Sequence, residues 1–303
     1  MGANFCNGDF ETMPDDAGLG MQARRKMVRV ISVAYALALA HAVIIVALGG
    51  IHAEPLALFG LIQLTPALAV LICDPGAFRR VVELLSRTGG AGAIVQAWAV
   101  AAFAVAAPIA AAAALGLFAT PYGPEVPANY PLKDFLPGIA LDPRWFWLAI
   151  LLAAPMLHLT NAAGEEILWR GYLLDLMVRV FPRKALGLIN GIFWAVWHFP
   201  MIILLGWDFP HQPIAGCLAI VLAQAAWSVW LVAERLRTDS LWPAIVAHAV
   251  ANAMVLGLYD RMVAHEWNVL LSPWGYVGAL AIGCVLLIRT TISPDDLSVA
   301  RSL

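Results

Sequence analysis

The chain has 303 residues, of which 62% are hydrophobic and only 13% are Asp, Glu, Lys or Arg. Soluble domains carry roughly 25% charged residues, so this composition excludes an ordinary soluble protein and predicts an all-α polytopic membrane protein. The sequence contains no basic tract, so we expect no nucleic acid among its partners.

Residues 1–27 are polar, and we predict that they form a cytoplasmic tail ahead of a transmembrane domain at 28–290. The apolar run that begins this domain continues to Leu48, which is too long for the apolar region of a signal peptide and fits a first transmembrane helix. Residues 291–303 are predicted to be a second cytoplasmic tail. The four cysteines are scattered without a CxxC pair, so they predict free thiols and no disulfide framework or zinc cluster.

Eight apolar spans follow one another, each near or above the roughly 20 residues that a helix needs to cross a bilayer. The fourth is the longest and contains Pro155 and Gly164, which predicts a kink or two helices. The sequence therefore predicts a bundle of about eight transmembrane helices, with spans at 28–49, 55–73, 92–118, 145–178, 187–205, 214–233, 241–259 and 270–289.

The positive charges outside the spans predict the orientation of the bundle, because cytoplasmic loops are enriched in Lys and Arg. With the N-terminus inside, 14 of the 18 Lys and Arg residues fall in cytoplasmic segments and 3 in outer loops, and Arg170 lies within the fourth span. We therefore expect both termini to be cytoplasmic. The longest outer loop, 119–144, is rich in proline and is predicted to lie at the membrane surface. Alanine-rich spans and compact loops favour a bacterial cytoplasmic membrane.

Ionisable side chains inside a bilayer are costly and therefore mark candidate functional sites. His41 and His158 are interpreted as hydrogen-bonded packing residues, the usual role of a lone buried histidine. The full set within the spans is His41, His158, Glu165, Glu166, Arg170, His198 and His248.

Helical geometry groups the remaining residues. Glu166 and Arg170 are four residues apart, so they share a helix face and can pair, whereas Glu165 points about 100° away. His248 and Asn252 share a face of the seventh span by the same spacing. Counted from the cytoplasmic ends at about 1.5 Å per residue, the acid, the two imidazoles and the amide reach overlapping depths. This predicts a buried site where a carboxylate and an imidazole activate a water molecule.

Three motifs in order resemble the signature of the CPBP family, the CAAX proteases and bacteriocin-processing enzymes. The EExxxR motif of that family fits residues 165–170, and its HxxxN motif fits residues 248–252. Its FxxxH motif fits at His198, but Trp194 stands in the Phe position and Phe193 comes one residue early. The resemblance is concentrated in residues 160–255 and marks a CPBP-like core at about 145–260.

The resemblance implies an eight-helix membrane bundle that hydrolyses a peptide bond on the cytoplasmic side. It also implies a role for each residue of the motifs. Glu165 activates water with help from His198, His248 and Asn252 stabilise the oxyanion, and Glu166 and Arg170 form a supporting pair. The Trp194 departure leaves an aromatic wall in place and bears on the shape of the substrate pocket.

The metal dependence is open at this point. Two histidines and a glutamate could hold a divalent metal such as zinc with one position left for water. However, the chain has no HExxH motif, and each ligand would come from a different helix. Members of the family are described both as metalloproteases and as metal-free glutamate proteases.

The leading hypothesis is an intramembrane endopeptidase that acts on a membrane-associated or hydrophobic peptide. A proton-coupled transporter is an alternative, because buried Glu and His also form proton relays. Many transporters have inverted repeats, and the sequence contains none that we detect. A catalytically idle membrane scaffold is a second alternative, although all the principal motif positions are present.

Overall fold

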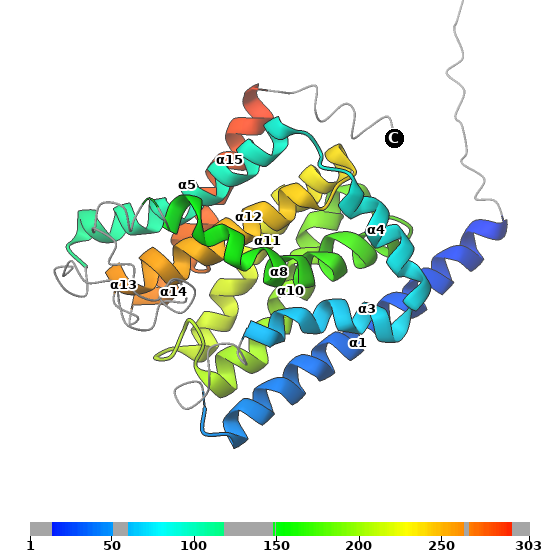
Figure 1. Ribbon diagram of the computed structural model, residues 1–303, viewed down its shortest axis with the longest axis horizontal. Helices are drawn as coiled ribbons and strands as arrows, with labels where there is room; N and C mark the ends of the chain where they lie inside the picture. Colours follow the sequence, from blue (N-terminus) through cyan, green and yellow to red (C-terminus); the bar gives the residue numbers. More distant parts are fainter. Residues whose placement is uncertain (1–13, 51–59, 118–147, 149, 264–266, 293–303) are drawn as a thin grey trace, which may run out of the picture.

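The computed structural model describes residues 14–50, 60–117, 148, 150–263 and 267–292. All regular elements in these ranges are helices, which confirms the prediction of an all-α fold. Figure 1 shows them gathered into one bundle. The predicted outer loop 119–144 and the residues at 1–13 and 293–303 lie outside the described ranges.

Six helical segments of the described chain are long and apolar enough to cross a membrane, which confirms a polytopic membrane protein. Each corresponds to one of the eight predicted spans. Two of them are composite, because a short π-helix, η4 (Val255–Tyr259), extends α12 (Trp242–Met254), and α14 (Asn268–Leu271) precedes α15 (Tyr276–Ile292). The six segments are Gly18–Ala47 in α1 (Pro14–Ala47), α5 (Ala91–Leu115), α10 (Arg183–Leu205), α11 (Pro213–Thr238), Trp242–Tyr259 and Asn268–Ile288.

The predicted span at 55–73 differs from a simple transmembrane helix. It contains a 3-10 turn, η1 (Leu61–Leu64), and α3 (Thr65–Cys73), which at about 1.5 Å per residue is too short to cross a bilayer alone. After α3 the chain passes through η2 (Pro75–Ala77) into α4 (Phe78–Ser86) with a bend of 110°. This bent pair makes a seventh candidate span if it is counted as one.

The predicted span at 145–178 is also interrupted. It consists of α8 (Ala154–Glu166), a π-helix η3 (Ile167–Leu173) and α9 (Leu174–Met177). This run carries three buried charged side chains, and it is not among the segments of the described chain that qualify as membrane spans by length and composition. The described chain therefore has six such segments, or seven with the bent pair, where the sequence predicted about eight.

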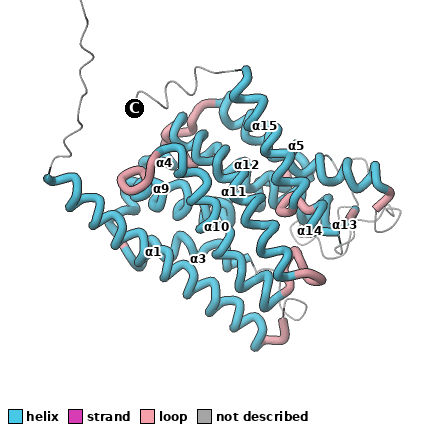
Figure 2. Tube along the Cα trace, turned by 180° about the vertical axis from the view of Figure 1, so that it is seen from behind, coloured by secondary structure: helices cyan, strands magenta, loops and turns pink. Residues whose placement is uncertain are grey.

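Helix α1 begins at Pro14, so it extends into the segment that we predicted to be a tail. Proline suits the first position of a helix because its missing N–H would have no partner there. The Nζ atom of Lys26 contacts the Oδ2 atom of Asp74 at 2.7 Å, which joins α1 to the turn after α3. Both views show α3 beside α1 (Figures 1 and 2).

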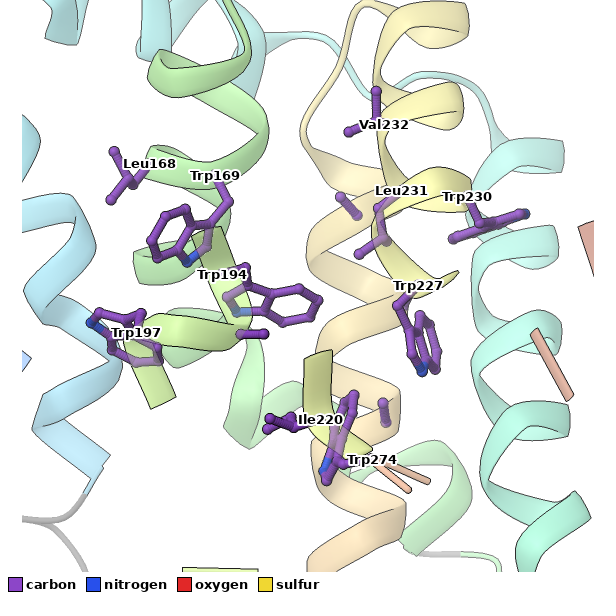
Figure 3. Close-up of a cluster of buried hydrophobic side chains, with 14 of the residues drawn as sticks. Leu168, Trp169, Trp194, Trp197, Ile220, Trp227, Trp230, Leu231, Val232 and Trp274 are labelled. Atoms are coloured by element: carbon purple, nitrogen blue, oxygen red, sulfur yellow. The ribbon is translucent and has the colours of Figure 1, made fainter. Parts of the chain in front are cut away.

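The centre of the bundle is filled by tryptophan side chains, several of which appear in Figure 3. Trp194, Trp197, Trp227 and Trp230 are each at most 1% exposed. Close packing between α10 and α11 depends on small residues. A Cβ atom at Gly191 would lie 2.5 Å from the carbonyl oxygen of Gln224, so a larger residue at this position would push the two helices apart.

Ion pairs join α4 to residues of other elements. This helix buries Val81 and Leu84, while Arg80 contacts Asp175 at 3.3 Å and Asp239 at 3.0 Å. These acidic residues belong to α9 and to the turn after α11. The remaining element, α13 (Asp260–Met262), follows η4.

Candidate active site

The site is built around three charged residues that are almost fully buried at the junction of α8 and η3. Glu165 is 1% exposed, and Glu166 and Arg170 are 0% exposed. The backbone changes from α-helix to π-helix directly after the two glutamates, and such π-helical turns are frequent at functional sites. Gly164 lets η1 approach closely, because a Cβ atom there would lie 2.5 Å from the carbonyl oxygen of Gln63.

Glu165 is held by two neutral donors from other elements. The Nε2 atom of Gln63 donates to Oε1 at 3.1 Å, and the indole Nε1 of Trp194 donates to Oε2 at 2.7 Å. The Nε2 atom of His248 lies 3.7 Å from Oε1, which is too long for a direct hydrogen bond. Two atoms at this separation can nevertheless both hydrogen-bond to one water oxygen. The carboxylate and the imidazole are therefore arranged to share a water molecule.

Glu166 binds two different partners with its Oε1 atom. Arg170 donates from Nη1 at 2.9 Å, as the spacing of four residues predicted, and His248 Nδ1 lies at 2.9 Å. Since a carboxylate only accepts hydrogen bonds, Nδ1 of His248 carries the proton. Glu166 thus fixes the orientation of His248, and Nε2 is the ring nitrogen that faces Glu165.

The guanidinium group of Arg170 also packs against an aromatic face. Its Cζ atom lies 4.1 Å from the ring centroid of Trp194, a cation–π geometry. The same indole lies edge-on to His198 and His248, with centroid separations of 6.0 and 5.3 Å. Trp194 therefore contacts the acid, the cation and both imidazoles.

His198 is held through its Nδ1 atom and through the plane of its ring. Nδ1 lies 3.0 Å from the carbonyl oxygen of Trp194 and 3.3 Å from the side-chain amide of Gln224. Because the carbonyl can only accept, Nδ1 carries the proton and Nε2 keeps a lone pair. The Oε1 atom of Gln224 is buried without a hydrogen-bond partner in the described chain, which fits an amide turned so that Oε1 faces Nδ1.

Asn252 has a side-chain donor without a hydrogen-bond partner in the described chain. Its Nδ2 atom is buried and has no hydrogen-bond partner among the residues that the structure describes. A buried amide donor without a partner is costly, so such groups often face a ligand or an ordered water molecule.

Four of the six predicted site residues are in direct contact or near contact, and they are Glu165, Glu166, Arg170 and His248. His198 is connected to them through Trp194. The structure gives Asn252 no hydrogen bond to this group. The closest imidazole to Glu165 among the contacts described is His248, whereas the family resemblance assigned the assisting role to His198.

Two partners of Glu165 were not recognised from the sequence. Trp194 was interpreted as an aromatic wall, but it also donates a hydrogen bond to the carboxylate. Gln63 was not noticed, although a polar amide within the apolar run LIQLTP is a detectable signal.

The sequence left open whether these side chains hold a metal ion. The part of the chain with described coordinates contains no group of three His, Cys, Asp or Glu side chains placed to hold a metal ion. Both oxygens of Glu165 accept hydrogen bonds from neutral donors, and Nδ1 of each histidine is engaged by an acceptor. Donation from Nδ1 leaves Nε2 of each neutral imidazole as the nitrogen that keeps its lone pair.

The part of the chain that contains the three motifs is similar to known proteins. Residues 142–254 match the family model described as "Type II CAAX prenyl endopeptidase Rce1-like". The protein "CAAX prenyl protease 2" of Methanococcus maripaludis is 40% identical over 48 residues, which cover 16% of this chain and 18% of that protein. The chain thus matches less than a fifth of the length of this curated relative. The family resemblance inferred from the three motifs is confirmed.

Proposed function

We propose that this chain, whose residues 142–254 belong to the Rce1-like family of type II CAAX prenyl endopeptidases, is itself an intramembrane endopeptidase. The observation that carries the proposal is the buried carboxylate of Glu165, with an imidazole nitrogen of His248 at 3.7 Å. These groups come from different helices, so the packing of the bundle creates the pair.

Glu165 acts as the general base in this proposal. It takes a proton from a water molecule as the water oxygen forms a bond to the peptide carbonyl carbon. The hydrogen bonds from Gln63 and Trp194 orient the carboxylate for this step. The same group then gives the proton to the leaving nitrogen as the C–N bond breaks. His198, with its lone pair on Nε2, accepts a hydrogen bond from the water and helps to orient it.

His248 and Asn252 stabilise the negative charge that develops on the carbonyl oxygen. In this proposal both ring nitrogens of His248 carry protons, with Nδ1 facing Glu166 and Nε2 facing Glu165, so that Nε2 can donate to the oxyanion. Asn252 supplies a buried Nδ2 donor that has no other partner in the described chain. Donors that are fixed before the reaction can stabilise an oxyanion by a few kcal/mol in a dry site.

The substrate is proposed to be a peptide that lies in or at the membrane, because the site is buried within the transmembrane bundle. The archaeal relative is named a CAAX prenyl protease, so a prenylated C-terminal peptide is the first substrate to test. Hydrolysis in this proposal uses the protein's own carboxylate and imidazoles.

The experiment is a cleavage assay with purified protein in proteoliposomes. Fluorogenic peptides that end in a CAAX sequence, with and without a prenyl group, separate a requirement for the lipid from simple peptide hydrolysis. The expected result is cleavage by the wild type and by Glu83→Gln, which changes a side chain that is 48% exposed on α4, and no cleavage by His248→Ala. Equal rates for all three proteins would refute the proposed role of the site.

A further inference from the structure

The chain folds back over His198 directly after α10 ends. Gly206 terminates the helix with a φ of +67°, in the left-handed region that favours glycine. The next residue, Trp207, stacks on the imidazole of His198, with ring centroids 5.2 Å apart and an interplanar angle of 12°. We call residues 206–212 the Trp207 loop. It covers one face of an imidazole that belongs to the candidate site.

Hydrogen bonds from two later elements hold this loop in place. Asn268 donates from Nδ2 to the carbonyl oxygen of Asp208, and Ser272 donates from Oγ to Oδ2 of the same residue at 3.1 Å. The hydroxyl of Tyr259 in turn donates to Oδ1 of Asn268 at 3.1 Å. Tyr259, Asn268 and Ser272 are each at most 1% exposed, so these anchors belong to the rigid interior.

The backbone of the loop is itself in an unusual conformation. Asp208 has a φ of +61°, in the left-handed region, which aspartate adopts more readily than most non-glycine residues. The two hydrogen bonds to Asp208 hold it in this conformation. Asp208 directly follows the residue that touches His198.

We infer that the Trp207 loop is a positioning device for the imidazole of His198, with Trp207 as the contact residue and Asp208, Asn268 and Ser272 as its anchors. The Nδ1 hydrogen bond to the Trp194 carbonyl fixes which nitrogen carries the proton, and the indole of Trp207 fixes the plane of the ring. Together these two contacts fix the direction in which the Nε2 lone pair of His198 points. The inference rests on the proposed function for its catalytic consequence, but the stacking contact is tested independently of it.

The test compares three variants in proteoliposomes. Trp207→Leu removes the aromatic face, Trp207→Phe keeps a smaller one, and Trp267→Leu removes a tryptophan that is 38% exposed near α14 and serves as the matched control. Three measurements are made on each variant: kcat and KM for a cleaved peptide, the temperature of thermal unfolding, and the rate at which diethyl pyrocarbonate modifies His198, read by mass spectrometry.

For Trp207→Leu we expect a fall in kcat of about 10- to 100-fold with little change in KM, because misplacement of a catalytic group by about 1 Å has effects of this size. We also expect His198 to be modified several-fold faster. Trp207→Phe should recover most of both properties, and Trp267→Leu should match the wild type.

The inference is overturned if Trp207→Leu leaves both kcat and the modification rate of His198 unchanged. It is also overturned if kcat and thermal stability fall together while the reactivity of His198 stays the same, since the loop would then be only structural. If the wild type cleaves no peptide, the proposed function fails, and the modification rates still decide whether Trp207 shields His198. Should Trp207→Leu not fold, Ser272→Ala, which removes one hydrogen bond to the loop, must raise the modification rate.

Discussion

Glu165 and Glu166 are adjacent in the chain, yet their carboxylates meet different kinds of partner. Glu166 faces the cation Arg170 and a protonated nitrogen of His248, whereas Glu165 accepts from the neutral donors Gln63 and Trp194. The Oε1 atom of Glu166 already accepts from both Arg170 and His248, so this oxygen is occupied by structural partners. The contacts thus support Glu165 as the base and Glu166 as the residue that holds His248.

The first prediction concerns the indole of Trp194. Trp194→Phe removes the N–H that donates to Glu165 while keeping an aromatic ring near Arg170. Hydrogen bonds to charged groups contribute roughly 1.5–3 kcal/mol, so we expect kcat to fall about 10- to 100-fold with normal protein yield. Steady-state kinetics with a CAAX peptide measure this effect. An unchanged kcat would mean that Trp194 only fills space.

The second prediction concerns the buried ion pair. Glu166→Gln leaves the buried guanidinium of Arg170 without its anion, and breaking such a pair typically costs roughly 3–5 kcal/mol. We expect a low yield of folded protein, measured by size-exclusion chromatography. The double variant Glu166→Leu with Arg170→Met should recover the yield, because no buried charge remains, but it should stay inactive, because His248 has lost its anchor. Full activity of the double variant would contradict the supporting role.

At the residue scale, the sequence predicted contacts that depend on helical spacing and missed those that depend on packing between helices. The Glu166–Arg170 pair follows from a separation of four residues. The contact between Glu165 and Gln63 requires the close approach of η1 to Gly164, and no spacing rule gives that partner. The hydrogen bond from Trp194 to Glu165 was not predicted, because the indole ring was considered only as an apolar surface.

At the element scale, the positions of the motifs are related to where the helices are interrupted rather than to how long the helices are. The motif EExxxR crosses from α-helix into the π-helix η3, and residues after HxxxN enter the π-helix η4. Neither change is marked by a distinctive residue, so the sequence could not predict them. The bend of 110° after α3 does have a signal, since Asp74, Pro75 and Gly76 disfavour a continuous helix. We placed the end of the second span there without predicting α4.

The third prediction belongs to the loop between α10 and α11. Burial raises the pKa of Asp208 from 3.8 to about 7, and the hydrogen bond from Ser272 offsets this only in part. Since the native state holds this proton more tightly than the unfolded state, the stability from Asp208 is complete below about pH 4 and is lost as the pH rises through 7. Asp208→Asn removes the titration, and Tyr259 and Asp260 remain the nearby titratable groups.

The melting temperature of wild type relative to Asp208→Asn should therefore fall between pH 5 and pH 8. Thermal unfolding in detergent at several pH values measures this difference. A difference that is constant across the range would show that Asp208 does not titrate there.

At the scale of the whole molecule, composition and hydropathy were sufficient to predict a helical membrane protein. This is expected, because a backbone in lipid must satisfy its hydrogen bonds internally, and long apolar helices do so. The sequence predicted more spans than qualify in the described chain. The segment that carries Glu165, Glu166 and Arg170 is interrupted and contains three buried charged side chains, and the second span is short and bent. The predicted orientation, with both termini cytoplasmic, stays a prediction.

The site itself is a property of the whole bundle. Its carboxylate lies on α8, its supporting donors on η1 and α10, and its facing imidazole on α12. The motifs in the sequence named Glu165, Trp194 and His248, but not Gln63, for this region. Their distances depend on how the helices pack around small residues such as Gly164 and Gly191, which a single sequence does not reveal.

The central claim is that the carboxylate of Glu165 activates water for peptide hydrolysis. The most direct measurement compares the initial rate of CAAX-peptide cleavage by wild type, Glu165→Gln and Glu83→Gln in proteoliposomes, where Glu83 is a control on α4 with a side chain that is 48% exposed. General bases contribute about 10²- to 10⁴-fold, so Glu165→Gln should lose at least about 100-fold in rate while it folds normally and Glu83→Gln retains full activity. A folded Glu165→Gln protein that cleaves at the wild-type rate would contradict the account.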